Sequence, residues 1–203
     1  MIAALYVLTD GPYFGLRGID PYDILRDAKK YKGPHPVIAH PPCERWGRYW
    51  GGGPMLHGTK NQKTLGDDEQ TFAHALWAVR SFGGVLEHPQ GSHAFRYYGL
   101  PLPKIGGGWT DVDLFGGRSC CVSQGYYGHR AQKLTWLYGV GINFKELKWG
   151  KAPGKFIKIE EGFHSNEERA RLIKTGICQR LSSRQRAETP LVFRDVLISL
   201  IMP

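Results

Sequence analysis

Short apolar runs separated by amphipathic stretches make up the hydrophobic pattern of this chain. Four apolar runs predict buried strands, at residues 2–8, 36–40, 85–88 and 134–140. Apolar residues at helical spacing predict helices after four capping signals, Asp20-Pro21, Asp67-Asp68, Ser165 and Thr189-Pro190. Strands that alternate with helices indicate an α/β fold. We therefore predict a reduced Rossmann-like fold, a mostly parallel sheet flanked by helices.

The first predicted helix runs from Asp20 to about Tyr31. Asp20 is a preferred N-cap residue, proline is favoured at the first helical position, and Gly33-Pro34 would end the helix. This helix would join the first two strands in a right-handed parallel unit. Residues 91–119 show no clear period and are expected to be irregular. We predict residues 1–142 as an α/β core and residues 143–203 as a basic, helical segment that packs on it.

Charge and cysteine content restrict the class of protein. The formal net charge is +9 at pH 7, which favours polyanionic partners, with nucleic acid first among them. The four cysteines, Cys43, Cys120, Cys121 and Cys178, are too few for a disulfide framework. We interpret them as reduced thiols of a cytoplasmic protein. No signal peptide and no membrane-spanning stretch is evident, so no membrane partner is predicted.

A long loop follows the second predicted strand. Residues 44–64 are rich in glycine and interleave cationic with aromatic side chains: Arg45, Trp46, Arg48, Tyr49, Trp50, Lys60 and Lys63. Guanidinium and ammonium groups neutralise phosphates, and aromatic faces stack on bases. The loop is therefore predicted to bind nucleic acid. A second basic cluster lies between residues 169 and 186. It is explained equally well as a nucleic-acid contact and as an ordinary solvated helix face.

Three reactive groups stand at or near the ends of predicted strands. Cys43 follows residues 36–40 through Pro41-Pro42, Glu87 lies in residues 85–88, and His129-Arg130 precede residues 134–140. In a parallel sheet such ends share one edge, so a thiol, a carboxyl and a guanidinium would converge there. We expect neighbouring cations to favour the thiolate of Cys43. We also expect an apolar environment to raise the pKa of Glu87, so that it can donate a proton.

These motifs resemble those of the cytosine-C5 DNA methyltransferases. Pro41-Pro42-Cys43 resembles the Pro-Pro-Cys motif of that family, whose cysteine adds to C6 of a flipped cytosine. Val85–Pro89 is similar to the glutamate motif, in the Glu-x-Pro form of degenerate relatives. The resemblance implies that Glu87 contacts N3 and the exocyclic amine. The chain as a whole also resembles small phage-type relatives of the family, which implies a host cytoplasm if it is viral.

The segment around Arg130 loosely resembles the arginine strand of the same family. The resemblance implies that Arg130, with His129 or Lys133, orients the base. It also implies S-adenosylmethionine as cofactor. A reduced cofactor turn would then comprise Gly11, Gly15 and Gly18, with Asp20 near the ribose. The family, however, places two further strand–helix units between the first strand and Pro-Pro-Cys, where this chain has room for one.

Two alternatives keep part of this interpretation. Addition at C6 also leads to deamination, hydroxymethylation or base exchange without S-adenosylmethionine. A catalytically inert relative would bind DNA, in an anti-restriction role, and would be indifferent to Cys43 and Glu87. No metal is predicted, because neither His40 nor Cys43 belongs to a set with zinc-finger spacing. Target sequence, free nucleotide as substrate and oligomeric state stay open.

Overall fold

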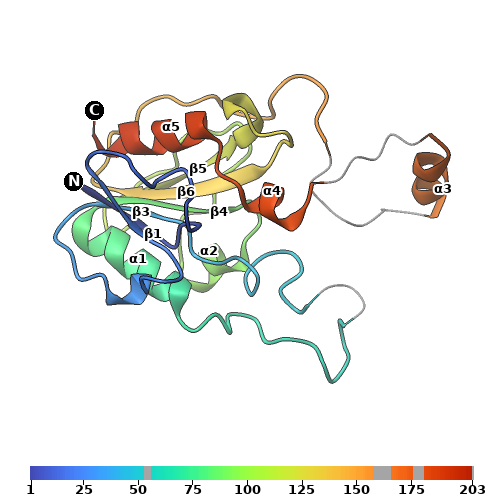
Figure 1. Cartoon of the computed structure of the whole chain (residues 1–203), viewed down its shortest axis with the longest axis horizontal. Coiled ribbons are helices and arrows are strands. Elements are labelled where there is room, and N and C mark those ends of the chain that lie inside the picture. Colours follow the sequence, from blue (N-terminus) through green and yellow to red (C-terminus); the bar gives the residue numbers. More distant parts are fainter. Residues whose placement is uncertain (53–55, 158–165, 176–180, 203) are drawn as a thin grey trace.

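A computed structural model describes residues 1–52, 56–157, 166–175 and 181–202 (Figure 1). The strands are β1 (Ile2–Leu5), β2 (Ile19–Tyr22), β3 (Val37–Ala39), β4 (Gly84–Pro89), β5 (Gly117–Ser123) and β6 (Leu134–Val140). In the described part they form one sheet in the order β2-β1-β3-β4-β6-β5. The first four strands are parallel, and β6 is antiparallel to both of its neighbours. The predicted α/β fold with a mostly parallel sheet is confirmed.

Two helices cover opposite faces of the sheet, α1 (Thr71–Phe82) on one side and α5 (Leu191–Ile201) on the other (Figure 1). The remaining described helices are short or lie at the periphery: η1 (Ala28–Lys30), α2 (His93–Tyr97), η2 (Gln124–Tyr127), α3 (Asn166–Thr175) and α4 (Ser183–Ala187). Helix α5 belongs to the core, because Phe193, Leu197 and Leu200 are fully buried. The second face of the sheet therefore depends on the C-terminal part of the chain.

Strands β1 and β3 are apolar throughout because both of their faces are buried. Ala3 and Leu5 of β1 pack in the cluster under α1, whereas Ile2 and Ala4 pack in the cluster under α5. Successive side chains of a strand point to opposite faces, so such a strand has no polar alternation. Gly84 begins β4 where a side chain could not fit, because an added Cβ would overlap the Val37 carbonyl of β3.

The predicted helix from Asp20 to Tyr31 is wrong. Residues 19–22 form the edge strand β2, which pairs in parallel with β1 and tolerates Pro21 because one side of an edge strand needs no donor. The carboxylate of Asp23 then accepts hydrogen bonds from the backbone N–H groups of Leu25 and Arg26, both at 3.0 Å. This local turn competes with helix formation, and only the 3₁₀ turn η1 follows.

The boundaries of the other helices and strands differ less from the predicted ones. Residues 91–119 are not wholly irregular, since α2 begins after the Ser92 N-cap and β5 begins at Gly117. Strand β1 ends at Leu5 rather than residue 8, because Tyr6 takes a left-handed φ of 60°. Helix α1 begins as predicted after Asp67-Asp68, but its N-cap is Gln70, whose side chain makes no cap hydrogen bond, and Asp68 accepts the Phe72 N–H at 2.9 Å from two residues further back. Ser165 and its predicted capping box lie outside the described residues.

Candidate functional site

The ends of β3 and β4 bring the two motif residues to one edge of the sheet. Ala39 pairs with Leu86, so His40 and Glu87 follow at the same level of adjacent parallel strands. Both side chains extend to the face covered by α5, by the alternation of each strand. Pro41-Pro42 end the ladder, and the Cys43 carbonyl then accepts the Gly47 N–H at 2.7 Å. Cys43 therefore begins a tight turn at the exposed rim of this edge.

Both carboxylate oxygens of Glu87 are engaged. Oε2 lies 3.1 Å from Nδ1 of His40, and Oε1 accepts a hydrogen bond of 3.1 Å from Nε2 of Gln124. The same amide of Gln124 donates to the Thr135 hydroxyl at 2.9 Å. The Glu87 side chain is only 13% exposed, so these partners hold it in one orientation. A buried carboxylate with satisfied oxygens is a rigid acceptor.

The expected raised pKa of Glu87 is wrong. Burial by itself raises the pKa, but the hydrogen bond from His40 and the positive charge of Lys133 outweigh it and hold the pKa at about 2. Glu87 is therefore ionised at neutral pH. Its neighbour His88 stays uncharged, because burial lowers its pKa to about 4. The carboxylate can accept N–H groups, but it carries no proton of its own to donate.

His40 connects Glu87 to a tyrosine from a different part of the chain. The Tyr13 hydroxyl lies 2.9 Å from Nε2 of His40, and Tyr13 comes from the loop between β1 and β2. Strand β1 has β2 on one side and β3 on the other, which makes its carboxyl end a topological switch point. Tyr13 is fully buried there, and burial raises its pKa well above the usual value. Tyr13, His40 and Glu87 thus form a continuous hydrogen-bonded chain.

Lys133 is the cation of this site. Its charge lowers the pKa of both Cys43 and Glu87, while burial lowers the pKa of the amine itself. For Cys43, partial desolvation and the negative charge of Glu87 outweigh Lys133, so the thiol pKa is raised. The expectation that cations lower it is wrong in net direction. An accessible thiol, a fixed carboxylate and an ammonium group nevertheless interact at one edge.

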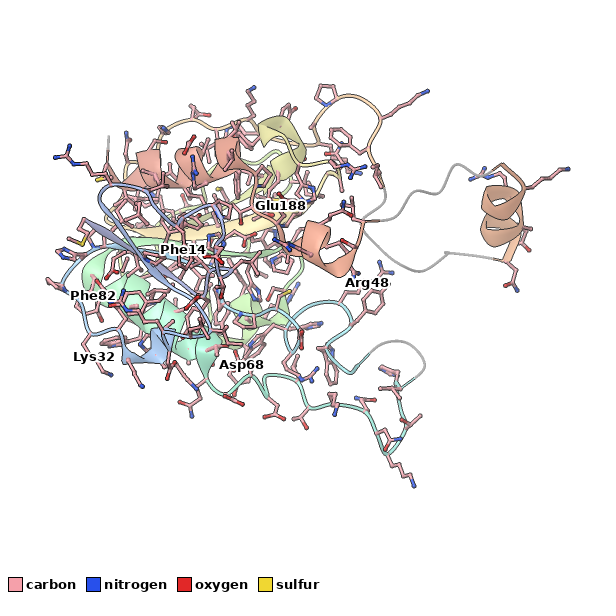
Figure 2. All side chains as sticks on the ribbon, in the orientation of Figure 1. Phe14, Lys32, Arg48, Asp68, Phe82 and Glu188 are labelled. Atoms are coloured by element: carbon pink, nitrogen blue, oxygen red, sulfur yellow. The ribbon has the colours of Figure 1, made fainter. Side chains whose placement is uncertain are left out.

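The direction of β6 explains why Lys133 reaches the site. Because β6 is antiparallel to β4, its first residues lie at the edge where β3 and β4 end. Lys133 takes a left-handed φ of 36°, which is a strained conformation for a residue with a side chain. Its Nζ donates to the Glu188 carbonyl at 2.8 Å, in the segment between α4 and α5. Figure 2 labels Glu188 on this segment.

Comparison of this chain with known protein families, with curated proteins and with solved structures gives no match.

Arg130 and His129 occupy different positions from those predicted. Arg130 is exposed, and Lys133 rather than Arg130 is the cation that lowers the pKa of Glu87. His129 is buried in a turn, where its Nδ1 accepts the Ala131 N–H at 3.0 Å, and burial lowers its pKa. These contacts give His129 a structural part in the turn before β6.

The predicted cofactor turn leads into strand β2 instead of a helix. Gly15 and Gly18 have left-handed φ angles of 73° and 82°, and a Cβ at either glycine would meet open space. Gly11 ends a tight turn. The Asp20 carboxylate pairs with the Arg26 guanidinium. The loop therefore differs from the predicted strand-to-helix turn, with open space around two of its glycines and the Asp20 carboxylate already paired.

The loop after Cys43 is anchored by one of its predicted nucleic-acid contacts. Trp46 is 1% exposed, packs against Phe72 and Tyr98, and donates from Nε1 to Asp68 at 2.7 Å. The prediction that Trp46 contacts nucleic acid is therefore wrong, because its ring belongs to the core. Arg45 is partly buried, and its carbonyl accepts the Gly66 N–H, which joins the two limbs of the loop.

The rest of this loop projects from the body of the molecule (Figure 1). Arg48, Tyr49, Lys60 and Lys63 are exposed, and Trp50 is partly exposed. The Arg48 guanidinium lies 5.5 Å from the centre of the Tyr49 ring. Figure 2 labels Arg48 on the limb next to Cys43. Exposed cations and aromatic rings thus stand beside an exposed thiol, and such groups are the ones that contact phosphates and unpaired bases in single-strand binding proteins.

Sequence reasoning missed Tyr13, Gln124 and the role of His40. The sequence pattern indicates His40 only as a zinc-ligand type, although it directly precedes Pro-Pro-Cys at the end of its strand. Aligning the ends of the two predicted strands pairs His40 with His88, one residue from Glu87, so the sequence carried a signal that His40 lies near Glu87 but not the register. Tyr13 comes from the loop after β1 and Gln124 from the 3₁₀ helix η2, and neither position had such a signal in the sequence.

Other features of the described residues lie away from this edge. An open surface cavity of about 380 Å³ between η1 and α1 is lined by Lys29, Lys32, His74 and Trp77, among others, and by none of the predicted site residues. Among the described residues, no three metal-ligating side chains come together. Within the same residues, no helix has the length and apolar character needed to cross a lipid bilayer.

Proposed function

We propose that this chain modifies a pyrimidine base of DNA through a covalent adduct between Cys43 and C6 of the base. The observation that carries the proposal is the convergence of the Cys43 thiol, the Glu87 carboxylate and Lys133 at one sheet edge. Carboxyl ends of strands in open α/β sheets are the usual location of ligands. The resemblance of Pro41–Cys43 and Val85–Pro89 to cytosine-C5 methyltransferase motifs supports the same chemistry.

Each group has a distinct part in this reaction. The thiolate of Cys43 is the nucleophile, and the positive charge of Lys133 stabilises it. The ionised Glu87 accepts an N–H of the ring or of its exocyclic amine, and so fixes the base. Addition at C6 makes C5 nucleophilic, so that C5 accepts an electrophile, of which a solvent proton is the simplest.

The substrate must present the base outside a stacked duplex. C6 of a stacked pyrimidine cannot be reached by a thiol at a sheet edge, so the base is either extruded or already unpaired. Arg48, Tyr49, Lys60 and Lys63 lie on the loop that begins at Cys43 and would hold the phosphates and neighbouring bases. The net charge of +9 favours the same polyanion.

Denaturing mass spectrometry tests the adduct directly. The protein is incubated with a single-stranded oligonucleotide that carries 2-pyrimidinone, whose C6 is more electrophilic than that of cytosine. We expect a one-to-one adduct on the peptide that contains Cys43. Cys43→Ser should abolish it, and Glu87→Gln should reduce it about 100-fold, in the range of a lost catalytic contact.

Glu69→Gln is the matched control, since the Glu69 side chain is 86% exposed and lies away from Cys43. An absent adduct, or one that forms equally in Cys43→Ser, would overturn the proposal. Retained oligonucleotide binding in that case would favour the inert DNA-binding relative.

A further inference from the structure

Hydrogen bonds join Tyr13, His40 and Glu87 in one chain. A purely structural His40–Glu87 pair would need only one nitrogen of the imidazole, whereas here both are used. His40 uses both ring nitrogens, with Tyr13 at 2.9 Å from Nε2 and Glu87 at 3.1 Å from Nδ1. Its side chain is 11% exposed, so water reaches it only in part. An imidazole between two fixed partners is held in one orientation, and histidine is the side chain that most often transfers protons in enzymes.

Addition to C6 of cytosine requires a proton that Glu87 lacks. The electron pair displaced from the ring by the thiolate ends on N3, which must then be protonated. Glu87 is ionised at neutral pH, because its pKa is held at about 2. Uracil differs, since its N3 already carries a proton and donates it to a carboxylate. The ionised Glu87 can therefore accept a hydrogen bond from N3 of uracil, whereas N3 of cytosine must first gain a proton.

We propose that His40, held between the Tyr13 hydroxyl and the Glu87 carboxylate, is the positioning residue that supplies this proton through Glu87 and so makes cytosine a substrate. The inference rests on the proposed function of Cys43. His40 must be an imidazolium when cytosine binds, with Nδ1–H donated to Glu87 and Nε2–H to the Tyr13 oxygen. Burial keeps the proton on Tyr13, whose pKa is raised well above the usual value, so that Tyr13 orients the ring.

The step balances without a co-reactant. The Cys43 sulfur forms a bond to C6, the C5–C6 π pair moves to C4–C5, and the C4–N3 π pair becomes a lone pair on N3. A proton passes from His40 Nδ1 to Glu87 and from Glu87 to N3, which leaves a neutral imidazole. C5 then takes a deuteron from heavy water and loses its original proton. Expulsion of the thiolate restores the ring, and the N3 proton returns to His40.

Several other ionisable groups face this chain and enter its pH dependence. Lys133, directly before β6, and His88 of β4 act on Glu87, and Cys43 follows β3. Arg194 and Asp195 of α5 act on Tyr13 from the covering helix. The test therefore compares two substrates in the same protein, since these groups affect both alike.

The experiment measures exchange of the C5 proton for deuterium in heavy water, by mass spectrometry of matched oligonucleotides that contain one cytosine or one uracil. In the wild type, we expect the ratio of exchange on cytosine to exchange on uracil to decrease as pH rises from 5.5 to 8.5, because the growing fraction of Cys43 thiolate accelerates both reactions alike. His40→Asn should lower exchange on cytosine about 100-fold and on uracil less than about threefold, in the range of proton-transfer contributions. Tyr13→Phe, which keeps the packing, should lower exchange on cytosine about tenfold.

His93→Asn and Tyr97→Phe are controls at exposed positions and should match the wild type. Thermal unfolding of every variant establishes that it folds. Equal loss on both substrates in His40→Asn, or no loss on cytosine, would overturn the role of His40 while the proposed function stands. Absence of exchange on both substrates in the wild type, together with absence of the 2-pyrimidinone adduct, would overturn both.

Discussion

Nδ1 of His40 lies 3.1 Å from Oε2 of Glu87, although 47 residues separate them in the chain. The contact follows from the parallel register of β3 and β4, which pairs Ala39 with Leu86 and sets the next two residues side by side. His40 and Lys133 together lower the pKa of Glu87 more than burial raises it. One register therefore fixes both the position and the charge of the carboxylate next to Cys43.

The reactivity of Cys43 should respond in opposite directions to its two charged neighbours. Glu87 raises and Lys133 lowers the pKa of the thiol. We expect Glu87→Gln to accelerate, and Lys133→Met to slow, alkylation of Cys43 at pH 7.5, each by about threefold to tenfold. Peptide mapping after iodoacetamide treatment measures the rate at Cys43 itself. Glu69→Gln should leave it unchanged, and a common direction for both site variants would contradict the assigned geometry.

Acid should destabilise the fold through Glu87. Its pKa is about 2 in the folded protein, lower than the ordinary value of 4.5, so its stabilising contribution is complete above pH 4.5 and is lost as pH falls to 2. A shift of this size corresponds to about 3 kcal/mol. Urea unfolding should show a steeper loss of stability between pH 4.5 and 2.5 in the wild type than in Glu87→Gln. Parallel curves would show that the carboxylate is not held in this state.

Asp68 should be the strongest anchor of the loop that follows Cys43. Its carboxylate accepts the Trp46 indole N–H at 2.7 Å, the Thr71 hydroxyl at 3.0 Å and the Phe72 N–H at 2.9 Å. Asp68→Ala removes the acceptor of an N–H in the first turn of α1 and leaves a buried indole N–H without its acceptor. The expected cost is about 2–3 kcal/mol in the free energy of unfolding, measured with urea. Asp67→Ala, at an exposed neighbour, should change it by less than about 0.5 kcal/mol.

Lys60 and Lys63 should contribute to nucleic-acid binding through phosphates. Both are exposed on the projecting loop. Replacing both by alanine should weaken duplex DNA binding and reduce the slope of log K against log salt by about 2. Fluorescence anisotropy at several salt concentrations gives this slope. Lys30→Ala, an exposed lysine of η1, is the control, and an equal effect there would mean that the loop has no special part.

S-adenosylmethionine should not bind the isolated protein with micromolar affinity. The Asp20 carboxylate is paired with Arg26, and the glycines at 15 and 18 border open space. Calorimetric titration, alone and with a cytosine-containing duplex, checks this expectation. Saturable micromolar binding in either condition would restore the turn at residues 11–18 as a cofactor site and make methyl transfer the first reaction to assay.

The sequence predicted most of the central fold because its signals there are local. The apolar runs at β3, β4 and β6 and the helical spacing of α1 and α5 each reflect burial on fixed faces, and burial determines which residues can stand there. It failed at residues 20–31, where a strong capping signal was overridden by the pairing of β2 with β1. Edge pairing is a tertiary effect, and no local pattern distinguishes it from a helix start.

For the site, the sequence by itself determined which reactive groups are available and that Cys43 and Glu87 each follow or lie in a strand. Only the tertiary structure decided their neighbours and their charge. The antiparallel direction of β6 brings Lys133 rather than Arg130 to the edge, and the long loop after β1 brings Tyr13 to His40. The charge of Glu87 depends on the balance between burial and these contacts, which join residues distant in the chain. Such a balance is a property of distances in space, and a sequence motif does not contain it.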